Sequence, residues 1–331
     1  MRRLAELSGL VAPVLLLALV GVVGTFTSRS VQFQFRFALV MATIVIALYV
    51  FVGNSGVVSF GHVSFVAVGG FAAGLTTVPE ALKLSLSPDL FPFIASAEVG
   101  NALSLLIAAV VGGVFALIVG VPLMRLSGLS AGIATFAVLV ITNNVLRNWE
   151  AIGPGARTLS LVPETTGFLQ ATIGVIAVAA LAFLYQRSRF GRVLRASSDD
   201  PAAAQGAGVD IYRQRLLAFT LSGALAGFAG GLLVHLLGSI TTQQVYLDLA
   251  FLTLAMLVIG GVRSLWGAVV GALLVSGINS LLLTAERGLS LGVTEVTVPT
   301  GTRLVTLGAV MALILLFRPR GVTGGRELSL R

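Results

Sequence analysis

The sequence predicts an all-α polytopic membrane protein with about ten transmembrane helices, some of them short or broken. Two observations support this fold class. Of the 331 residues, 56% are hydrophobic and only 10% are charged, whereas soluble domains carry roughly 25% charged residues. Long apolar segments also recur from one end of the chain to the other, with charged residues between them. No linker or soluble domain interrupts this pattern, so residues 1–331 are expected to form one membrane domain.

The apolar segments can be placed in order along the chain. A straight span needs ~20 residues, and segments 63–77 and 249–262 are clearly shorter, which is typical of broken or re-entrant helices. Segment 10–25 follows Arg2 and Arg3, so its alternative is a cleaved signal peptide, although no clear small-x-small cleavage site follows it. The ten segments are residues 10–25, 37–52, 63–77, 99–123, 129–146, 169–185, 216–237, 249–262, 266–284 and 302–317.

The arginines predict the orientation. With ten spans, the most basic stretch, residues 187–215, shares one side with both chain ends, and the positive-inside rule makes that side cytoplasmic. Membrane topology therefore explains the net charge of +8 better than nucleic-acid binding does. The arginines expected inside, apart from that stretch, are Arg2, Arg3, Arg125, Arg263, Arg318 and Arg320.

The basic stretch 187–215 also encodes a short helix. Asp200 is a good helix cap, Pro201 suits the first helical position, and three alanines follow before Gly206 and Gly208 end the helix. A capped helix on the cytoplasmic side of a membrane bundle predicts a docking element for a cytosolic partner.

Glycines recur every four residues in three segments. This spacing places them on one helix face, where small residues let two backbones approach closely. We expect ordinary helix packing from them, with a role in subunit contacts or substrate passage as the alternative. They are Gly70 and Gly74, then Gly223, Gly227 and Gly231, and then Gly267 and Gly271.

A polar stretch interrupts the apolar pattern at residues 53–65. Irregular backbone at membrane depth is tolerated where it lines a cavity, so we expect a broken helix that faces a passage through the bundle, with a tight cytoplasmic loop as the alternative. The residues expected along this passage are Gly53, Asn54, Ser55, Gly56, Ser59, Gly61, His62 and Ser64.

The chain offers little chemistry of its own. It has no cysteine, and its two histidines, His62 and His235, have no carboxylate neighbours in sequence, so we expect hydrogen-bonding roles for them and no metal site. The acidic residues fall in loops or at segment ends, which disfavours an ion-driven transporter and an intramembrane enzyme. Lys83, the only lysine, follows Leu82 and not glycine, so there is no phosphate-binding loop. If ATP drives this protein, another chain binds it, and we expect no cofactor here.

Three stretches resemble the permeases of branched-chain amino acid ABC importers. They are N-S-G-V-V-S-F-G-H-V-S-F-V-A-V-G-G-F from Asn54, R-A-S-S-D-D-P-A-A-A-Q-G-A-G-V-D from Arg195, and L-D-L-A-F-L-T-L-A-M-L-V-I-G-G-V-R-S-L-W-G-A-V-V-G-A from Leu247. The closing F-R-P-R-G from Phe317 fits the same family, and the LivM-type subunit resembles the chain more than the LivH-type does.

This resemblance implies a transport subunit in a bacterial inner membrane, with both termini cytoplasmic. It implies as partners two cytosolic ATPase subunits, a second permease of the LivH type and an extracytoplasmic substrate-binding protein. The residues that it implies in the ATPase contact are Arg195, Asp199, Asp200, Ala203, Ala204, Gly206 and Gly208.

The expected substrates are branched-chain or other small amino acids. The outer stretch I-G-P-G-A-R-T from Ile152 departs from the family pattern, so urea, short amides, nucleosides and sugars remain alternatives. A further alternative is an ion-coupled secondary transporter, for which Asn54, Ser55 and the backbone of residues 53–61 are the visible ion ligands.

Overall fold

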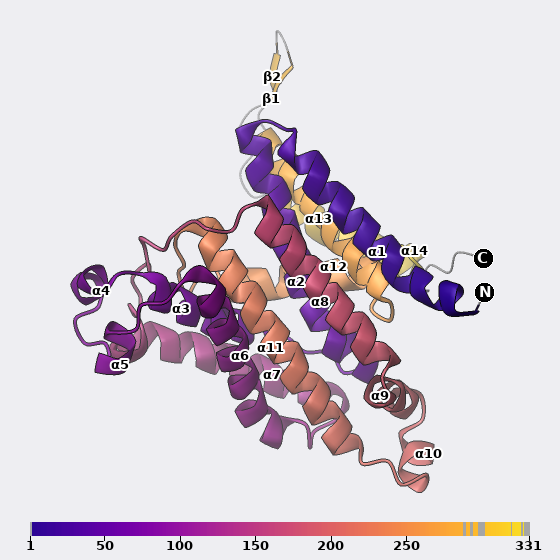
Figure 1. Ribbon diagram of the computed structural model, residues 1–331. Coiled ribbons are helices and arrows are strands. Elements are labelled where there is room, and N and C mark those ends of the chain that lie inside the picture. The colour runs from indigo at the N-terminus through magenta and orange to yellow at the C-terminus, as the bar shows by residue number, and fades with distance from the viewer. Residues whose placement is uncertain are drawn as a thin grey trace.

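The computed structural model describes residues 2–286, 289–291, 294–296, 302–318, 320–325 and 327, and there the chain is almost entirely helical (Figure 1). Besides loops, the described residues contain a small antiparallel hairpin, in which Leu289 pairs with Val296, and an isolated bridge between Leu159 and Ile240. The elements are α1 (Arg2–Thr25), α2 (Arg29–Ser55), α3 (His62–Thr77), α4 (Glu80–Leu86), α5 (Pro92–Ala95), α6 (Asn101–Leu123), α7 (Gly128–Asn148), the 3-10 turn η1 (Glu150–Ile152), α8 (Phe168–Arg187), α9 (Arg189–Asp199), α10 (Pro201–Gly206), α11 (Ile211–Leu237), α12 (Leu247–Gly260), α13 (Leu265–Glu286), β1 (Leu289–Leu291), β2 (Thr294–Val296) and α14 (Thr302–Phe317).

Each of the ten apolar segments falls on a helix of its own. Among the described residues, six helices are long and apolar enough to cross a membrane, namely α2, α6, α7, α8, α11 and α13. Residues Gly9–Thr25 of α1, together with α3 and α12, form shorter apolar helices. The polytopic all-helical class is thus confirmed, while ten spans remain a prediction. Helices α4, α5 and α9 and the hairpin were not expected, because they lie in segments too polar or too short for hydropathy to detect.

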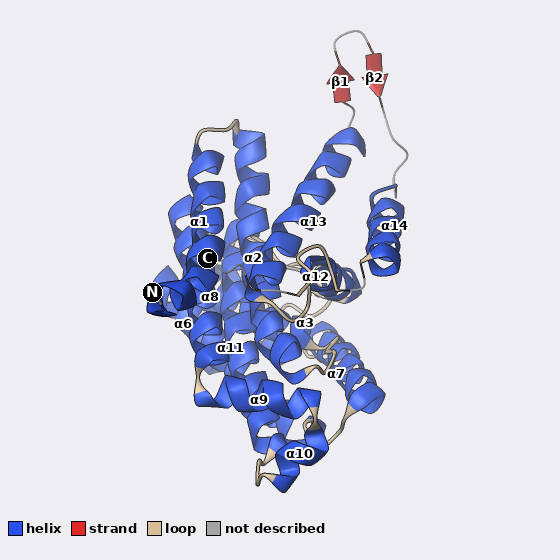
Figure 2. Ribbon diagram, turned by 90° about the vertical axis from the view of Figure 1, so that its right-hand side faces the viewer, coloured by secondary structure: helices blue, strands red, loops and turns tan. Residues whose placement is uncertain are grey.

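Helix α11 lies at the centre of the bundle, packed against α2, α3 and α6 (Figures 1 and 2). The apolar half of α2, from Leu39 to Ser55, is buried along its whole length. By contrast α6, α7 and α8 bury only one side and expose large apolar side chains on the other, such as Ile118 and Leu169. A half-exposed apolar helix is the pattern expected of a helix that borders lipid.

Glycines bring α11 against its neighbours. A Cβ added at Gly112 of α6 would lie 2.8 Å from the Cα of Gly227, and one at Gly231 would lie 2.8 Å from a methyl of Leu105. At Gly223 an added Cβ would collide with Ala116 of α6. The three helix-spaced glycines of α11 therefore lie along one close crossing with α6.

The other spaced glycines also stand at close approaches. A Cβ at Gly70 would lie 3.1 Å from the carbonyl oxygen of Gly230 in α11, and one at Gly271 would lie 2.7 Å from the Cα of Gly260 in α12. Gly74 meets Leu159 of the loop before α8, at 2.8 Å, and Gly267 meets the turn that precedes α13. The seven glycines thus serve five different contacts.

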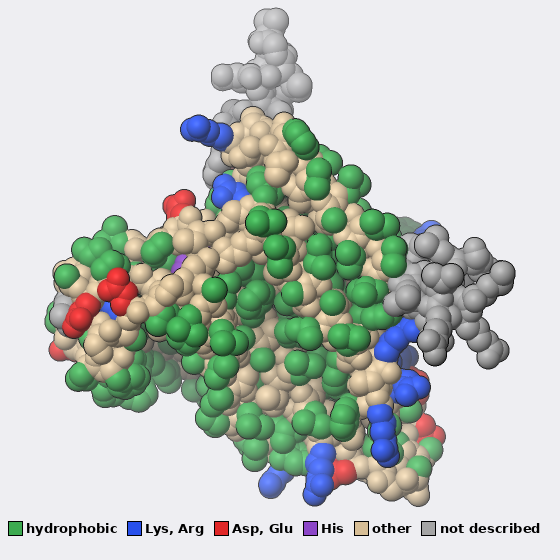
Figure 3. Space-filling view, in the orientation of Figure 1, with side chains coloured by type: hydrophobic (Ala, Val, Ile, Leu, Met, Phe, Trp, Pro, Cys, Tyr) green, Lys and Arg blue, Asp and Glu red, His purple; other side chains and the backbone are tan. Residues whose placement is uncertain are grey.

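Charge is distributed unevenly over the surface. In Figure 3 the Lys and Arg side chains gather around α9, α10 and the start of α11, on an otherwise mostly apolar face. In Figure 1 the segment that contains α4 and α5 lies away from α9 and α10. Its Lys83 is only 1% exposed. Its Nζ donates to the carbonyl oxygens of Ile94 and Ala97, at 3.0 and 2.5 Å. Burial lowers the pKa of this amine.

Candidate functional site

Three capping residues shape the basic stretch into consecutive helices. Ser188 Oγ accepts from Gly191 N at 3.2 Å to begin α9, and Asp200 Oδ1 accepts from Ala203 N at 2.9 Å to begin α10. Gly208, with φ +79°, follows α10 in the left-handed conformation that favours glycine. Asp210 then caps α11. The helix that Asp200 and Pro201 predicted is therefore present and begins at the expected cap. None of its residues is buried.

Arg195 points from α9 into the bundle. Its Nε donates to Asn54 Oδ1 of α2 at 2.7 Å, and its Nη2 donates to Gln186 Oε1 of α8 at 3.0 Å and to the hydroxyl of Tyr49. Tyr49 in turn donates to the same Gln186 oxygen at 2.5 Å. One guanidinium thus joins α9 to α8 and to the last turns of α2, using only neutral acceptors. We call these four residues the Arg195 network.

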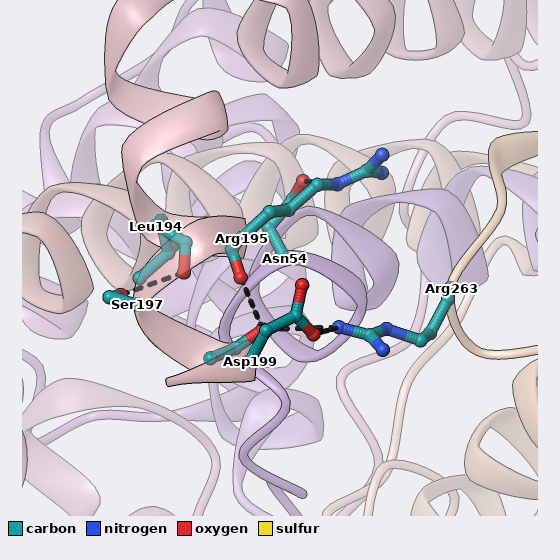
Figure 4. Close-up of polar contacts among 7 residues, drawn as sticks. Asn54, Leu194, Arg195, Ser197, Asp199 and Arg263 are labelled. Carbon is teal, nitrogen blue, oxygen red and sulfur yellow. Dashed lines mark hydrogen bonds and ion pairs between the residues drawn. The ribbon is translucent and has the colours of Figure 1, made fainter. Parts of the chain in front are cut away.

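A second link leaves the end of α9. Asp199 Oδ1 lies 2.5 Å from Arg263 Nη2 in the turn between α12 and α13, and the same nitrogen donates to Ser198 Oγ at 3.2 Å. Figure 4 shows Asp199 reaching Arg263 while Arg195 lies beside Asn54. Both side chains of the ion pair are more than half exposed, so we assign it at most about 1 kcal/mol.

The seven residues expected at an ATPase contact therefore divide into two groups. Arg195 and Asp199 bind other parts of this chain, and Asp200 caps α10. The remaining four, Ala203, Ala204, Gly206 and Gly208, lie on or next to the exposed α10. Tyr49, Gln186 and Arg263 were not predicted as site residues, although a tyrosine within one apolar segment and a glutamine directly after another were visible in the sequence.

The polar stretch 53–65 forms the break between α2 and α3. Helix α2 ends at Gly56, whose φ is +69°, and a Cβ there would lie 3.5 Å from Ser198 of α9. Gly61 presses against the backbone of Thr135 in α7, and Phe60 N donates to the hydroxyl of Thr135 at 3.2 Å. The break is therefore held between α7 and α9.

Most side chains of this stretch are enclosed in the bundle. Ser59 and His62 are at most 3% exposed, as are Asn54, Ser55 and Ser64. These described side chains face packed protein in this conformation, so a passage along them would require the helices around the break to move.

His62 anchors the break to the central helix. Its Nε2 lies 2.7 Å from Ser222 Oγ, whose own proton goes to the carbonyl of Ala47 at 2.6 Å, so the histidine nitrogen must be the donor. The other nitrogen, Nδ1, then accepts from Ser59 Oγ at 2.7 Å. The ring also stacks on Phe51, with 5.6 Å between centroids. Both ring nitrogens of His62 thus have hydrogen-bond partners within the protein.

His235 is placed in a similar way near the other end of α11. Its Nε2 lies 3.0 Å from Ser104 Oγ of α6, and its Nδ1 lies 3.1 Å from the carbonyl oxygen of Pro163. Both histidines hold helices together through hydrogen bonds, as the lack of carboxylate neighbours indicated.

Comparison with known proteins points to transport permeases. LivM of Escherichia coli (strain K12), a high-affinity branched-chain amino acid transport system permease protein, is 24% identical over 311 residues, which cover 84% of this chain and 66% of LivM. LivH of Salmonella typhimurium, from a system of the same description, is 24% identical over 307 residues, or 87% of this chain and 92% of LivH. A probable LivH of Methanocaldococcus jannaschii is 32% identical over 163 residues, or 47% of this chain and 48% of that protein.

These relatives do not separate the two subunit types. The chain is as similar to LivH as to LivM, and it spans about half of the archaeal relative and 66% of the E. coli one. Shorter stretches match permeases named for the import of fructose and of autoinducer 2. No solved structure matches the chain at a significant level.

The family itself is clear from its model. The model described as "Branched-chain amino acid transport system / permease component" matches residues 30–315, from the start of α2 almost to the end of α14. Together with the apolar helices, this match makes the chain a multi-pass membrane protein whose relatives are transport permeases. The protein belongs to the family of branched-chain amino acid transport permease components.

Proposed function

We propose that this chain is the transmembrane permease subunit of an ATP-driven importer of branched-chain or other small amino acids. Two cytosolic ATPase subunits, a second permease of the LivH type and an extracytoplasmic binding protein would complete the transporter. The complex would lie in a bacterial inner membrane, with both chain termini in the cytoplasm. The names of the relatives that match most of the chain support this proposal.

The Arg195 network is the observation that carries the mechanism. Helix α10 is exposed and capped, and it follows directly on α9, whose Arg195 binds Tyr49 and Asn54 near the end of α2. Asn54 lies two residues before Gly56, where α2 stops. If an ATPase moves α10 and α9, the same movement therefore displaces the end of α2 and the break before α3. In this proposal Arg195 transmits motion from the docking element, and Ala203 and Ala204 meet the ATPase.

The secondary-transporter alternative loses support from the same geometry. The amide of Asn54 accepts from Arg195 and donates to the carbonyl of Val50 at 2.9 Å, and Ser55 Oγ accepts from Val57 N at 3.2 Å. The side chains that a cation would need are already engaged. The choice of solute remains open to a second candidate, a sugar-like molecule, because a fructose import permease is 34% identical over 112 residues.

Ala204→Arg tests the docking element. The substitution adds bulk and charge to α10, where a helix must fit a partner, and it should abolish both ATPase co-purification and leucine transport in reconstituted membranes. Ala156→Arg is the control, because it adds the same side chain at an exposed alanine in the loop before α8, whereas Ala204 is half-buried in α10. If Ala204→Arg retains both ATPase binding and transport, α10 is not the coupling element.

Cysteine labelling tests the orientation. The chain has no cysteine, so Gln205→Cys in α10 and Thr158→Cys in the outer loop each provide a single exposed thiol. In intact cells an impermeant thiol reagent should modify the cysteine at 158 and spare the one at 205. Ser197 is unsuitable as a reporter because it is only 1% exposed. The opposite labelling pattern would place α10 outside and remove any contact with a cytosolic ATPase.

A further inference from the structure

A polar pocket lies between α2 and α13, away from the break and the Arg195 network. Its volume is about 380 Å³, within the ~300–1,000 Å³ of small-molecule sites, and the end of α11 contributes Leu237 to its wall. In Figure 2 helices α2 and α13 diverge toward the end opposite α9 and α10. The pocket is lined by residues 30–37 of α2 and 276–283 of α13. Its polar lining residues are Ser30, Gln34, Ser276, Asn279 and Ser280.

The two helices present these residues in matching patterns. Helix α2 lines the pocket with residues 30, 33, 34 and 37, and α13 lines it with residues 276, 279, 280 and 283. Both sets follow the i, i+3, i+4, i+7 spacing of one helix face. Each face combines serine and amide groups with a large apolar residue, such as Phe37 or Leu283. Helices α2 and α13, although apolar overall, thus both direct a row of polar side chains into the same pocket.

Some of these polar groups lack partners. Gln34 Oε1 accepts from Ser280 Oγ across the helix pair. The hydroxyl of Ser276, a residue only 6% exposed, has no hydrogen-bond partner in the protein, and Asn279 makes no side-chain hydrogen bond within the described part of the chain. A buried hydroxyl without a partner is unfavourable, above all in a helix that crosses a membrane, unless something else meets it.

The lining also limits what can bind. None of its described residues is charged, and the guanidinium of Arg36, on the same helix, lies over the ring of Phe168, 5.8 Å from its centroid. An ion of net charge would have no counter-charge here. A net-neutral molecule with hydrogen-bonding groups at one end and an aliphatic body would satisfy both the amide and hydroxyl groups and the phenylalanine and leucine walls.

We propose that the α2–α13 pocket is a binding site for such a solute during its passage through the permease. This inference rests on the proposed transport function and adds the place where the chain holds its cargo. A zwitterionic amino acid with a branched aliphatic side chain belongs to the ligand class that the pocket fits. The free groups of Ser276 and Asn279 would bind its polar end, and the wall that contains Leu237 and Leu283 would contact its side chain.

The absence of cysteine allows a direct test. Asn279→Cys places one thiol in the pocket, and Thr284→Cys places one on an exposed site of the same helix. Each variant is purified with its co-purifying subunits, placed in lipid nanodiscs and labelled with a small water-soluble methanethiosulfonate, with or without saturating L-leucine. Leucine should slow labelling at position 279 several-fold and leave position 284 unchanged.

Transport kinetics give a second readout. Ser276→Ala should raise the leucine concentration for half-maximal transport several-fold while ATPase co-purification stays normal. Thr43→Val is the matched control, because it removes a buried hydroxyl of α2 that donates only to the carbonyl of Leu39.

The outcomes separate the pocket from the proposed function. A complex that contains ATPases and transports leucine, yet shows no protection at position 279, overturns the pocket and leaves the transport function standing. A thiol at 279 that never reacts means that lipid or a neighbouring subunit fills the space, which also overturns it. Protection by D-fructose instead of leucine would support the pocket as a solute site and overturn the amino-acid assignment.

Discussion

The α6–α11 crossing and the α2–α9 junction join helices in opposite ways. At the crossing, backbone meets backbone, since a Cβ on Gly112 would lie 2.8 Å from the Cα of Gly227. At the junction, the helices are connected by long side chains, with Arg195 binding Tyr49, Gln186 and Asn54. At the α6–α11 crossing the two backbones are already in contact, so neither helix can move closer to the other. The α2–α9 junction is a set of hydrogen bonds that can be exchanged one at a time.

The difference indicates where the molecule can move. Close-packed surfaces resist intermediate positions, because a small shift loses contacts that no other position restores. A hydrogen bond to a charged group contributes about 1.5–3 kcal/mol and can be replaced by one to water or to another acceptor. We therefore expect α3, α6 and α11 to act as a rigid body, while the end of α2 that Arg195 holds moves together with α9.

The largest effect should follow from filling the crossing. Gly227→Leu places a side chain against the backbone of α6, where the helices have no space to yield, so we expect it to remove most of the folded protein. Folded yield is measured by size-exclusion chromatography in detergent. Gly277→Leu in α13 is the control, because nothing lies within 4 Å of a Cβ there. Equal yields of the two variants would show that the crossing is not tightly closed.

A smaller, functional effect should follow from changing the junction. Arg195→Gln removes the charge and most of the donors of the network, which should lower transport by about tenfold while the protein stays folded and bound to its ATPases. Arg192→Gln on the exposed side of α9 should change transport little. Measurement of transport and of ATPase co-purification on the same preparations distinguishes transmission from docking. Loss of ATPase binding in Arg195→Gln would mean that Arg195 belongs to the docking surface after all.

The smallest effect should come from the cap of α10. Asp200→Ala removes the acceptor for Ala203 N and should destabilise this short helix by about 1 kcal/mol, with a modest loss of transport. Asp200→Asn keeps a side-chain oxygen at the same place and should behave like the unchanged protein. Hydrogen exchange of the α10 amides reports the local stability. If exchange in the two variants is equally fast, the charge at Asp200 matters more than its capping oxygen.

The sequence predicted those features that depend on neighbours along the chain. The helix after Asp200 could be predicted because its cap, its proline and its glycines lie within nine residues. Hydropathy likewise placed a helix at each of the ten apolar segments. The glycine spacing indicated a packing face on α11 but not its partner, since Gly112 of α6 lies more than a hundred positions away from Gly227.

The candidate site depends on contacts between distant segments. Arg195 was expected to face a partner protein, and the structure turns it toward Tyr49, 146 positions earlier. No local pattern could have indicated that pairing. The pocket was different, because the polar residues at 30 and 34 and at 276, 279 and 280 already showed a helical period in the sequence. A search for polar stripes within the apolar segments and in the turns directly before them would have found it.

Because Lys83 is buried in the segment that contains α4 and α5, its chemical modification can measure how often that segment opens. The chain contains no other lysine, so an acylating reagent has no exposed lysine side chain to modify while Lys83 is covered and bonded to Ile94 and Ala97. Acylation at this residue would appear only when Lys83 leaves the carbonyl oxygens of Ile94 and Ala97 and becomes exposed. The rate at which this lysine adduct accumulates, followed by mass spectrometry, would report how often α4 and α5 separate, without any engineered label.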